Sequence, residues 1–147
     1  MFVEKTEKYE VVIGVQTDTA INSVIKRKID LLIESWEKYA KEYYDKYGIY
    51  VSAIANKGRA IYNKEWGCPD GGERVVTFNC TRNPKFIKDK VAYMLGVTYI
   101  TSLLKDEFKQ HTITMTVMED VTIKYITDED NMYIEGIKSI KEVENDV

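Results

Sequence analysis

Hydrophobic residues recur at every second position of the segment YEVVIGVQT near the N-terminus. Val11, Ile13 and Val15 share one side of an extended chain, whereas Gly14 and Gln16 fall on the other side. A side-chain repeat of two residues is typical of a half-buried strand. The pattern therefore predicts a strand at the start of the chain.

After residue 20 the spacing of the apolar residues changes to three and four. A helix would place them on one stripe, which holds Ile21, Ile25, Ile29, Leu32, Trp36, Tyr39, Tyr43 and Tyr47. This spacing predicts a helix of about seven turns with one face toward a core. The segment TDT (17–19) offers caps for its start. Gly48 ends the helix, because glycine readily adopts the left-handed conformation found after a last helical turn.

The middle of the chain predicts β structure. Residues 49–56 and 59–63 form a β-hairpin around a tight turn at Lys57–Gly58. A polar loop follows, and its sequence PDGG (69–72) is a turn signal. Residues 73–81, ERVVTFNCT, then alternate as a further strand.

A second helix and a last strand complete the pattern. Asn83 and Pro84 supply the N-cap and first position of the helix, which runs to about Gln110. The last strand extends over residues 111–127 and carries a bulge or turn at Glu119–Asp120. The order of elements is that of a ferredoxin-like α+β sandwich.

We therefore expect a single α+β domain over residues 1–127. Its antiparallel sheet should have about four to six strands, with two long helices on one face. Residues 128–147 carry seven acids against two lysines, a net charge of −5. This segment is expected to be an acidic C-terminal tail or to add a short strand over residues 132–140.

Charge and hydropathy narrow the class of protein. The formal net charge of the 147 residues is −3, so subtracting −5 for residues 128–147 leaves residues 1–127 at about +2. A dedicated nucleic-acid-binding domain would be far more basic. The sequence has neither a signal-like apolar run at its start nor a run long enough to span a membrane. We expect a cytoplasmic protein without membrane or nucleic-acid partners.

Motifs for catalysis are not found in the sequence. The single histidine, His111, and two widely spaced cysteines, Cys68 and Cys80, do not form a zinc site, so we expect no metal and no cofactor. No serine stands in a nucleophile elbow, and no glycine-rich phosphate loop precedes a helix. Both thiols should be free in a reducing compartment. An enzyme that uses Cys68 or His111 is the least favoured alternative.

Arginine placement is the most informative chemical feature. Arg59, Arg74 and Arg82 are three of only four arginines, and their planar forks suit anions better than lysine does. Arg82 also precedes the predicted helix start, where free N–H groups favour negative charge. Alternatively, the arginines pair on the surface with nearby acids, namely Glu65, Asp70 and Glu73.

Other residues complete the candidate ligand site. Tyr62 or Trp66 would stack on a ligand, and Asn79 or Asn83 would orient it. The sheet face opposite the helices is expected to be polar, with Gln16, Ser52, Thr77, Asn79, Thr112, Thr114 and Thr116 near Tyr50. This face could be solvated, pair with another subunit or close over a small ligand.

These observations favour a homodimeric, non-enzymatic protein that binds a small anionic ligand, such as a nucleotide-like metabolite. A sequestering or regulatory protein encoded by a phage or another mobile element would fit this description. The alternative is a protein–protein interaction module, or an inhibitor, without any small ligand.

Overall fold

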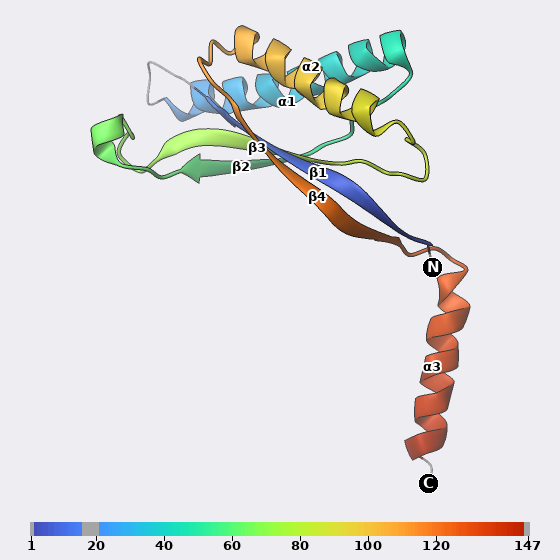
Figure 1. The fold of residues 1–147 in the computed structure, drawn as a ribbon. Helices are drawn as coiled ribbons and strands as arrows, with labels where there is room; N and C mark the ends of the chain where they lie inside the picture. Colours follow the sequence, from blue (N-terminus) through green and yellow to red (C-terminus); the bar gives the residue numbers. More distant parts are fainter. Residues whose placement is uncertain (1, 16–20, 146–147) are drawn as a thin grey trace.

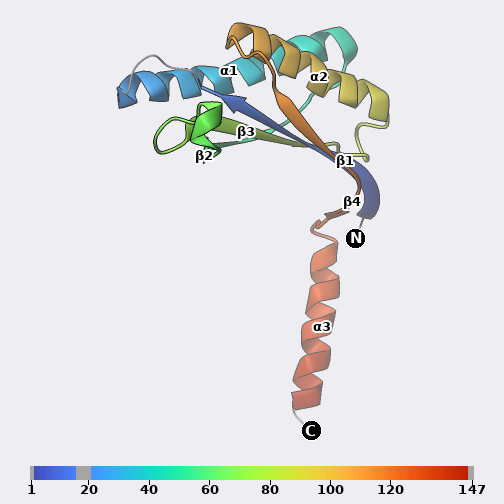
Figure 2. The same cartoon turned by 60° about the vertical axis from the view of Figure 1, so that its left-hand side comes forward.

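The computed structural model describes residues 2–15 and 21–145 (Figure 1). In chain order the elements are β1 (Phe2–Gly14), α1 (Asn22–Tyr47), β2 (Ile54–Ala60), the 3₁₀ turn η1 (Lys64–Trp66), β3 (Glu73–Thr81), α2 (Lys90–Glu107), β4 (Thr114–Tyr125) and α3 (Asp130–Asn145). The sheet order is β2-β3-β1-β4, with antiparallel neighbours throughout. Helices α1 and α2 cover one face of the sheet (Figures 1 and 2). The predicted ferredoxin-like α+β fold is confirmed.

The core lies between this sheet face and the two helices. Strands β1 and β3 sit in the middle of the sheet, with Val11 opposite Phe78 and Ile13 opposite Val76. The fully or nearly buried core residues include Tyr9, Val11, Ile13, Leu32, Trp36, Val76, Phe78, Cys80, Tyr93, Val97, Ile100 and Leu104. The apolar residues that recur every two positions in the strands thus pack against those that recur every three or four positions in the helices, and together they form one core.

Helix α1 is anchored to the sheet through Trp36. Its side chain is 5% exposed and stacks on Phe78, with the ring centroids 4.5 Å apart. The indole Nε1 donates a hydrogen bond to the carbonyl of Val51 at 3.2 Å, so the polar end of the ring is also satisfied. The helix ends at Gly48, whose φ of 73° confirms the predicted left-handed cap. The capping segment predicted at 17–19 lies outside the described residues, as does Gln16.

The two helices approach closely at Gly96 of α2. A Cβ atom there would lie 2.6 Å from Cε1 of Tyr43 and 2.9 Å from Cγ2 of Val51. The ring of Tyr43 therefore occupies the space that a side chain at position 96 would need. Its hydroxyl donates to the carbonyl of Ala92 at 2.6 Å, which fixes the ring on α2.

The predicted hairpin around Lys57–Gly58 is wrong. Residues 54–60 form one continuous strand, in which Lys57 faces Val76 and Gly58 faces Val75 of β3. A two-residue hairpin turn needs positive φ angles, and Gly58 has none. The hairpin instead joins β2 to β3 through residues 61–72, where Gly71 and Gly72 have φ angles of 81° and 90°.

The predicted start of the second helix is also wrong. Asn83 and Pro84 open only a turn, in which Asn83 Oδ1 accepts from the backbone N–H of Lys85 at 3.0 Å. Helix α2 begins later, after the N-cap Asp89, which accepts from the N–H of Ala92 at 2.9 Å. In the intervening chain, the carbonyl of Ile87 accepts a side-chain hydrogen bond from Arg82 at 2.8 Å.

The segment after β4 forms helix α3, so the short strand expected over residues 132–140 is wrong. Its exposed apolar residues Ile137, Ile140 and Val143 recur every three residues, and this period fits a helix better than a strand. Figures 1 and 2 show α3 projecting away from the sheet. Among the described residues, no helix combines the length and the apolar character needed to cross a bilayer.

Strand β4 contains the predicted bulge at Glu119–Asp120. Thr6 of β1 pairs with Val121 and Lys8 pairs with Met118, so two residues of β4 lie opposite one residue of β1. Asp120 has a φ of 56°, which makes this a local kink in the strand.

Candidate functional site

Arg82, the proposed centre of the anion site, is buried in an ion pair with Glu7. Its Nε donates to Glu7 Oε2 at 2.6 Å and its Nη2 donates to Oε1 at 3.2 Å. Its Nη1 donates to the carbonyl of Ile87 at 2.8 Å. The side chains of Arg82 and Glu7 are only 9% and 6% exposed. The guanidinium holds the pKa of Glu7 below its usual value. The guanidinium is thus engaged with the protein itself, and the expected helix N-terminus does not adjoin it.

The other two arginines lie together at the opposite end of β3. Arg59 of β2 and Arg74 of β3 face each other across the sheet. Nη1 of Arg59 donates to the carbonyl of Gly71 at 3.2 Å. The alternative partner Asp70 binds Lys64 instead, at 2.8 Å. The structure therefore brings together Arg59 and Arg74, and separates them from Arg82.

The two candidate asparagines are also apart. Asn79 is half-buried within β3, opposite Glu10 of β1. Asn83 lies near the far end of the sheet, where its Oδ1 accepts from the hydroxyl of Tyr125 at 2.5 Å. Asn83 thus stabilises the turn after β3, whereas Asn79 belongs to the half-buried middle of the sheet.

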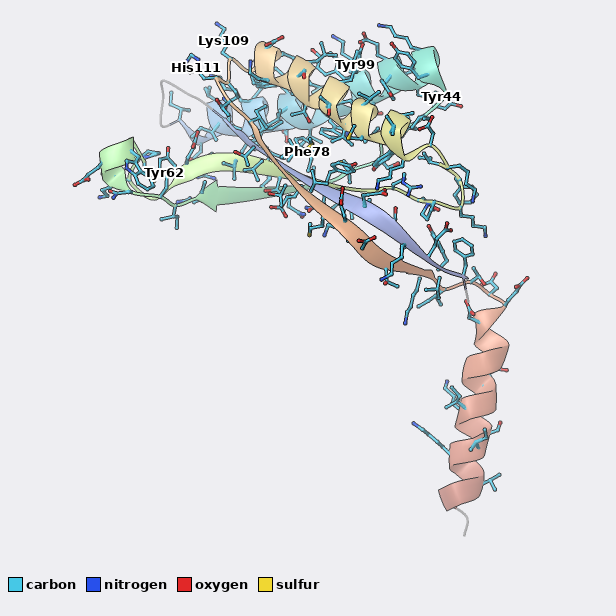
Figure 3. The ribbon with its side chains drawn as sticks, viewed as in Figure 1. Tyr44, Tyr62, Phe78, Tyr99, Lys109 and His111 are labelled. Carbon is cyan, nitrogen blue, oxygen red and sulfur yellow. The ribbon has the colours of Figure 1, made fainter. Side chains whose placement is uncertain are left out.

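The loop between β2 and β3 presents both candidate aromatic residues. Trp66 is 77% exposed, as predicted, and Tyr62 is also exposed. Asn63 caps the 3₁₀ turn by accepting from the N–H of Glu65 at 2.9 Å. The thiol of Cys68 accepts from the N–H of Tyr62 at 3.5 Å. Figure 3 shows Tyr62 beside this turn. The loop therefore has an internal framework that holds its aromatic side chains at the surface.

Tyr62 contacts an acid that the sequence suggested only as a partner for arginine. Its hydroxyl donates to Oε2 of Glu73 at 3.3 Å. Burial and the neighbouring carboxylate raise the pKa of Tyr62, so the phenol stays protonated and remains a donor. Glu73 is the first residue of β3 and is half-buried.

Two further residues complete the surroundings of this carboxylate. An added Cβ at Gly14, the last residue of β1, would lie 2.4 Å from Glu73 Oε1 and 3.3 Å from Gln110 Oε1. The amide of Gln110 is oriented by its Nε2, which donates to the carbonyl of Phe108 at 3.2 Å. We call Gly14, Tyr62, Glu73 and Gln110 the Glu73 cluster. Its members come from β1, the β2–β3 loop, β3 and the segment after α2.

The Glu73 cluster opens onto the sheet face opposite the helices. Since side chains alternate along a strand, Glu73 shares this face with Thr77 and Asn79 of β3. On β4 the exposed residues Thr114 and Thr116 continue the polar surface. A carboxylate beside an aromatic ring, next to a polar sheet, suits a ligand that carries positive charge and hydroxyl groups.

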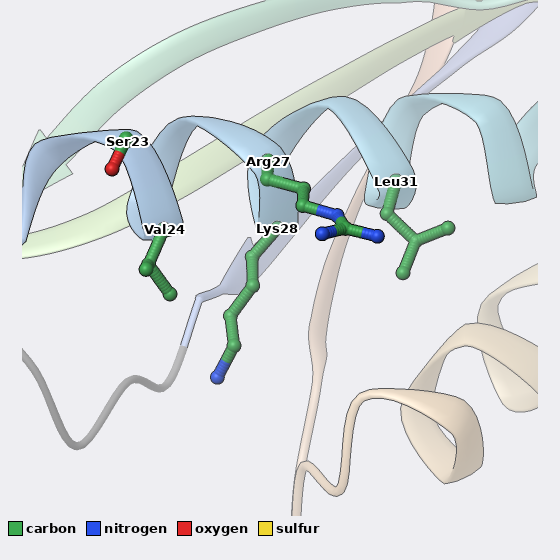
Figure 4. Close-up of a pocket in the computed structure, with 5 residues that line it drawn as sticks. All are labelled: Ser23, Val24, Arg27, Lys28 and Leu31. Carbon is green, nitrogen blue, oxygen red and sulfur yellow. The ribbon is translucent and has the colours of Figure 1, made fainter.

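A depression of about 420 Å³ lies on α1 and is lined by Ser23, Val24, Arg27, Lys28 and Leu31 (Figure 4). All of these residues come from one helix. The buried residues Ile29, Leu32 and Trp36 lie on another side of it. A site that orients a small molecule usually needs polar groups converging from several elements. The Glu73 cluster meets this requirement better than the depression on α1 does.

The residues considered for metal or thiol chemistry do not converge. Within residues 2–15 and 21–145, no three histidine, cysteine or acidic side chains are grouped so that they could hold a metal ion. Cys80 is fully buried, and the contacts described for Cys68 lie within its own loop and at the adjoining end of β2. His111 is exposed after the end of α2 (Figure 3).

The sequence profile of the SAM lyase family matches residues 4–127. This chain belongs to the SAM lyase family. The match spans the sheet, α1 and α2, together with all four residues of the Glu73 cluster. No curated protein matches the sequence.

Solved structures with a similar arrangement include a phage SAM lyase in complex with S-methyl-5′-thioadenosine. It is 14% identical, with a TM-score of 0.45 over 82% of this chain and 90% of that one. A phage SAM lyase in the apo state is 12% identical, with a TM-score of 0.46 over 84% and 91% of the two chains. A dimeric ferredoxin-like protein from an uncultured marine organism is 11% identical, with a TM-score of 0.45 over 85% and 95%. The family assignment rests on the sequence profile.

Family membership overturns the expectation of a non-enzymatic binding protein, because the SAM lyase family is a family of enzymes. A lyase does not need a nucleophile, a metal ion or a phosphate loop if its substrate already carries a good leaving group. The missing motifs were therefore a poor argument against catalysis.

Proposed function

We propose that this protein is an enzyme that cleaves S-adenosylmethionine and releases methylthioadenosine. The observation that carries the proposal is the family match over residues 4–127. The small ligand predicted from the sequence is then the substrate of a reaction. Methylthioadenosine, which one of the similar phage structures contains, is the purine product of this cleavage.

The substrate is activated before it reaches the protein. Its sulfonium sulfur leaves as a neutral thioether when the bond to the γ-carbon of the amino-acid chain breaks, and the bonding electron pair stays on sulfur. A lyase uses neither water nor a redox partner. The γ-carbon, which loses its bond to sulfur, must therefore form a new bond within the four-carbon fragment. Attack of the substrate carboxylate on the γ-carbon does so by forming a lactone. Loss of a β-proton to a base would give an alkene instead.

We favour the attack by the carboxylate because it moves no proton. The protein then has to fold the substrate so that a carboxylate oxygen approaches the γ-carbon opposite to sulfur. Positioning alone can lower a reaction barrier by about 7–11 kcal/mol for well-oriented groups. This route fits a site that offers hydrogen-bonding groups and aromatic rings without a nucleophile.

The substrate also changes the expected role of each site residue. The sulfonium and the ammonium are positive and the carboxylate is negative, so the molecule is a net cation rather than an anion. Glu73 would hold a positive group or the ribose hydroxyls, and the ring of Tyr62 would face the sulfonium. Trp66 would stack on the purine and Arg59 would bind the carboxylate.

The test is incubation of the purified protein with S-adenosylmethionine, followed by chromatography of methylthioadenosine. Proton NMR of the four-carbon product separates a lactone from an alkene, which have the same mass. Glu73→Gln should lower kcat/KM by about 10- to 100-fold, as expected for a lost charge-assisted hydrogen bond. Glu65→Gln, in the loop that precedes β3, is the matched control and should leave turnover unchanged. Wild-type protein that forms no methylthioadenosine would remove the proposal.

Self-association and location remain predictions. We expect the homodimer inferred from the polar sheet face, and a mass measurement at several protein concentrations would test it. Fractionation of cells that express the chain would test the expected cytoplasmic location.

A further inference from the structure

We propose that Gly14 is a positioning residue: the space left by its missing side chain fixes where the Glu73 carboxylate meets the substrate. This inference rests on the proposed function, because it assigns a task to a residue of the same site. The supporting observation is the distance of 2.4 Å between Glu73 Oε1 and the place where a Cβ at position 14 would lie.

Backbone conformation does not explain a glycine at this position. Gly14 pairs with Val75 within the sheet and is not among the glycines with positive φ. The next residue, Val15, continues the ladder by donating to the carbonyl of Arg74 at 2.8 Å. Glycine destabilises a strand, because it loses more conformational freedom on folding than any other residue does. A glycine inside a regular strand therefore points to a close approach by another group, and here that group is the Glu73 carboxylate.

The atoms that meet position 14 are the ends of two flexible side chains: the Glu73 carboxylate, which is much the nearer, and the Gln110 amide oxygen at 3.3 Å. A Cβ normally needs at least about 3.5 Å to a neighbouring heavy atom. An alanine would therefore displace the Glu73 carboxylate by about 1 Å and leave the strand in place. This displacement would alter the contact between Glu73 Oε2 and the hydroxyl of Tyr62, which spans 3.3 Å. A misplacement of 1 Å in a positioned group can lower a reaction rate by about 100-fold.

Gly58 provides a matched control, because it is also a strand glycine without positive φ. An added Cβ at this position would meet only Cγ2 of Val75, at 3.8 Å. This is an ordinary contact distance. Gly58→Ala therefore makes the same chemical change in the same sheet without touching the carboxylate.

The experiment compares Gly14→Ala and Gly58→Ala for turnover of S-adenosylmethionine, for thermal stability and for the ¹³C NMR signal of the Glu73 carboxyl carbon. Gly14→Ala should lower kcat by about 10- to 100-fold with a small change in Tm, and it should move the Glu73 signal. Gly58→Ala should change neither kcat nor the signal. The double variant Gly14→Ala/Glu73→Asp shortens the acid by one methylene, and should be more active than Gly14→Ala alone.

The carboxyl signal keeps this inference separate from the proposed function. An active wild type in which Gly14→Ala leaves kcat and the Glu73 signal unchanged would overturn the role of Gly14 alone. A moved signal in a wild type that makes no methylthioadenosine would overturn the proposed function, and would still support the placement of Glu73 by Gly14. A loss of kcat without any rescue by Glu73→Asp and without a moved signal would also count against the proposal.

Discussion

Arg82 holds the carboxylate of Glu7 in a buried two-point ion pair, with donor–acceptor distances of 2.6 and 3.2 Å. The pair joins β1 to the chain that follows β3. Removal of Arg82 leaves the buried Glu7 carboxylate with only the exposed Lys90, whose Nζ lies 3.5 Å from Glu7 Oε1. Arg82→Ala should therefore lower the free energy of unfolding by about 3 kcal/mol. Urea unfolding would measure this loss. Arg59→Ala, at an exposed position, should change stability by no more than about 0.5 kcal/mol. Equal effects of the two variants would contradict the structural role of Arg82.

The same pair makes stability depend on pH. Hydrogen bonds from Arg82 lower the pKa of Glu7 in the folded state below its ordinary value of 4.5. The stabilisation is therefore complete above this value, and it is lost as the pH falls below it through the folded-state pKa. Glu7→Gln should differ most from the wild type at neutral pH, and the gap should narrow below about pH 4.5. Unfolding midpoints measured between neutral and acidic pH would show this convergence. Glu34→Gln changes an exposed residue of α1, so its unfolding midpoint should change with pH in the same way as that of the wild type.

Gly96 should be essential to the packing of α2 on α1. An alanine there collides with the ring of Tyr43 and with Val51, both of which are buried. We expect Gly96→Ala to destabilise the protein by about 1–3 kcal/mol, despite the better helix propensity of alanine. Gly136→Ala in α3 meets nothing within 4 Å, so it should increase helicity without lowering the unfolding midpoint. Circular dichroism would report both effects, and a stabilised Gly96→Ala would disprove the close contact.

The two thiols should differ in reactivity. Burial raises the pKa of Cys80 to about 12, so this thiol is almost entirely protonated near pH 8 and is also closed to solvent. Cys68 is half-buried in a surface loop. Titration of native protein should therefore count one reactive thiol, and titration in denaturant should count two. Cys68→Ser should abolish the native reaction; two thiols that react equally fast would refute the buried position of Cys80.

The sequence allowed prediction of those elements whose spacing of apolar residues can be seen within the element itself. The stripe through Trp36 and the terminal Gly48 define α1, and alternation defines β1 and β3. The start of α2 could not be predicted in this way, because Asn83 and Asp89 are both acceptable caps. The turn after Asn83 packs beside Arg82, which binds Glu7 of another strand and the carbonyl of Ile87, and these contacts cannot be seen in the local sequence.

The Glu73 cluster was only partly predictable for a similar reason. Tyr62 was predicted to stack on a ligand, although it was assigned to a hairpin strand. Glu73 was expected only to pair with an arginine on the surface. Gly14 and Gln110 reach Glu73 only through the pairing of β1 with β3 and the return of the chain after α2. Gly14, directly after the apolar run Val11–Ile13 at the end of β1, was a signal in the sequence for a close approach by another group.

The bulge in β4 has a consequence for the behaviour of the protein at high concentration. Within the described sheet, β4 is an edge strand of 12 residues, and a straight, flat edge of this length would invite other chains to add to it and start aggregation. The kink at Asp120 breaks the regular row of backbone donors and acceptors near the middle, and Lys5 places its charged amine there, 3.4 Å from the carbonyl of Asp120. An incoming strand can then pair with only one half of the edge at a time, so fewer backbone hydrogen bonds can form than along a straight edge. The irregularity in this strand thus disfavours edge-to-edge association between folded copies of the protein.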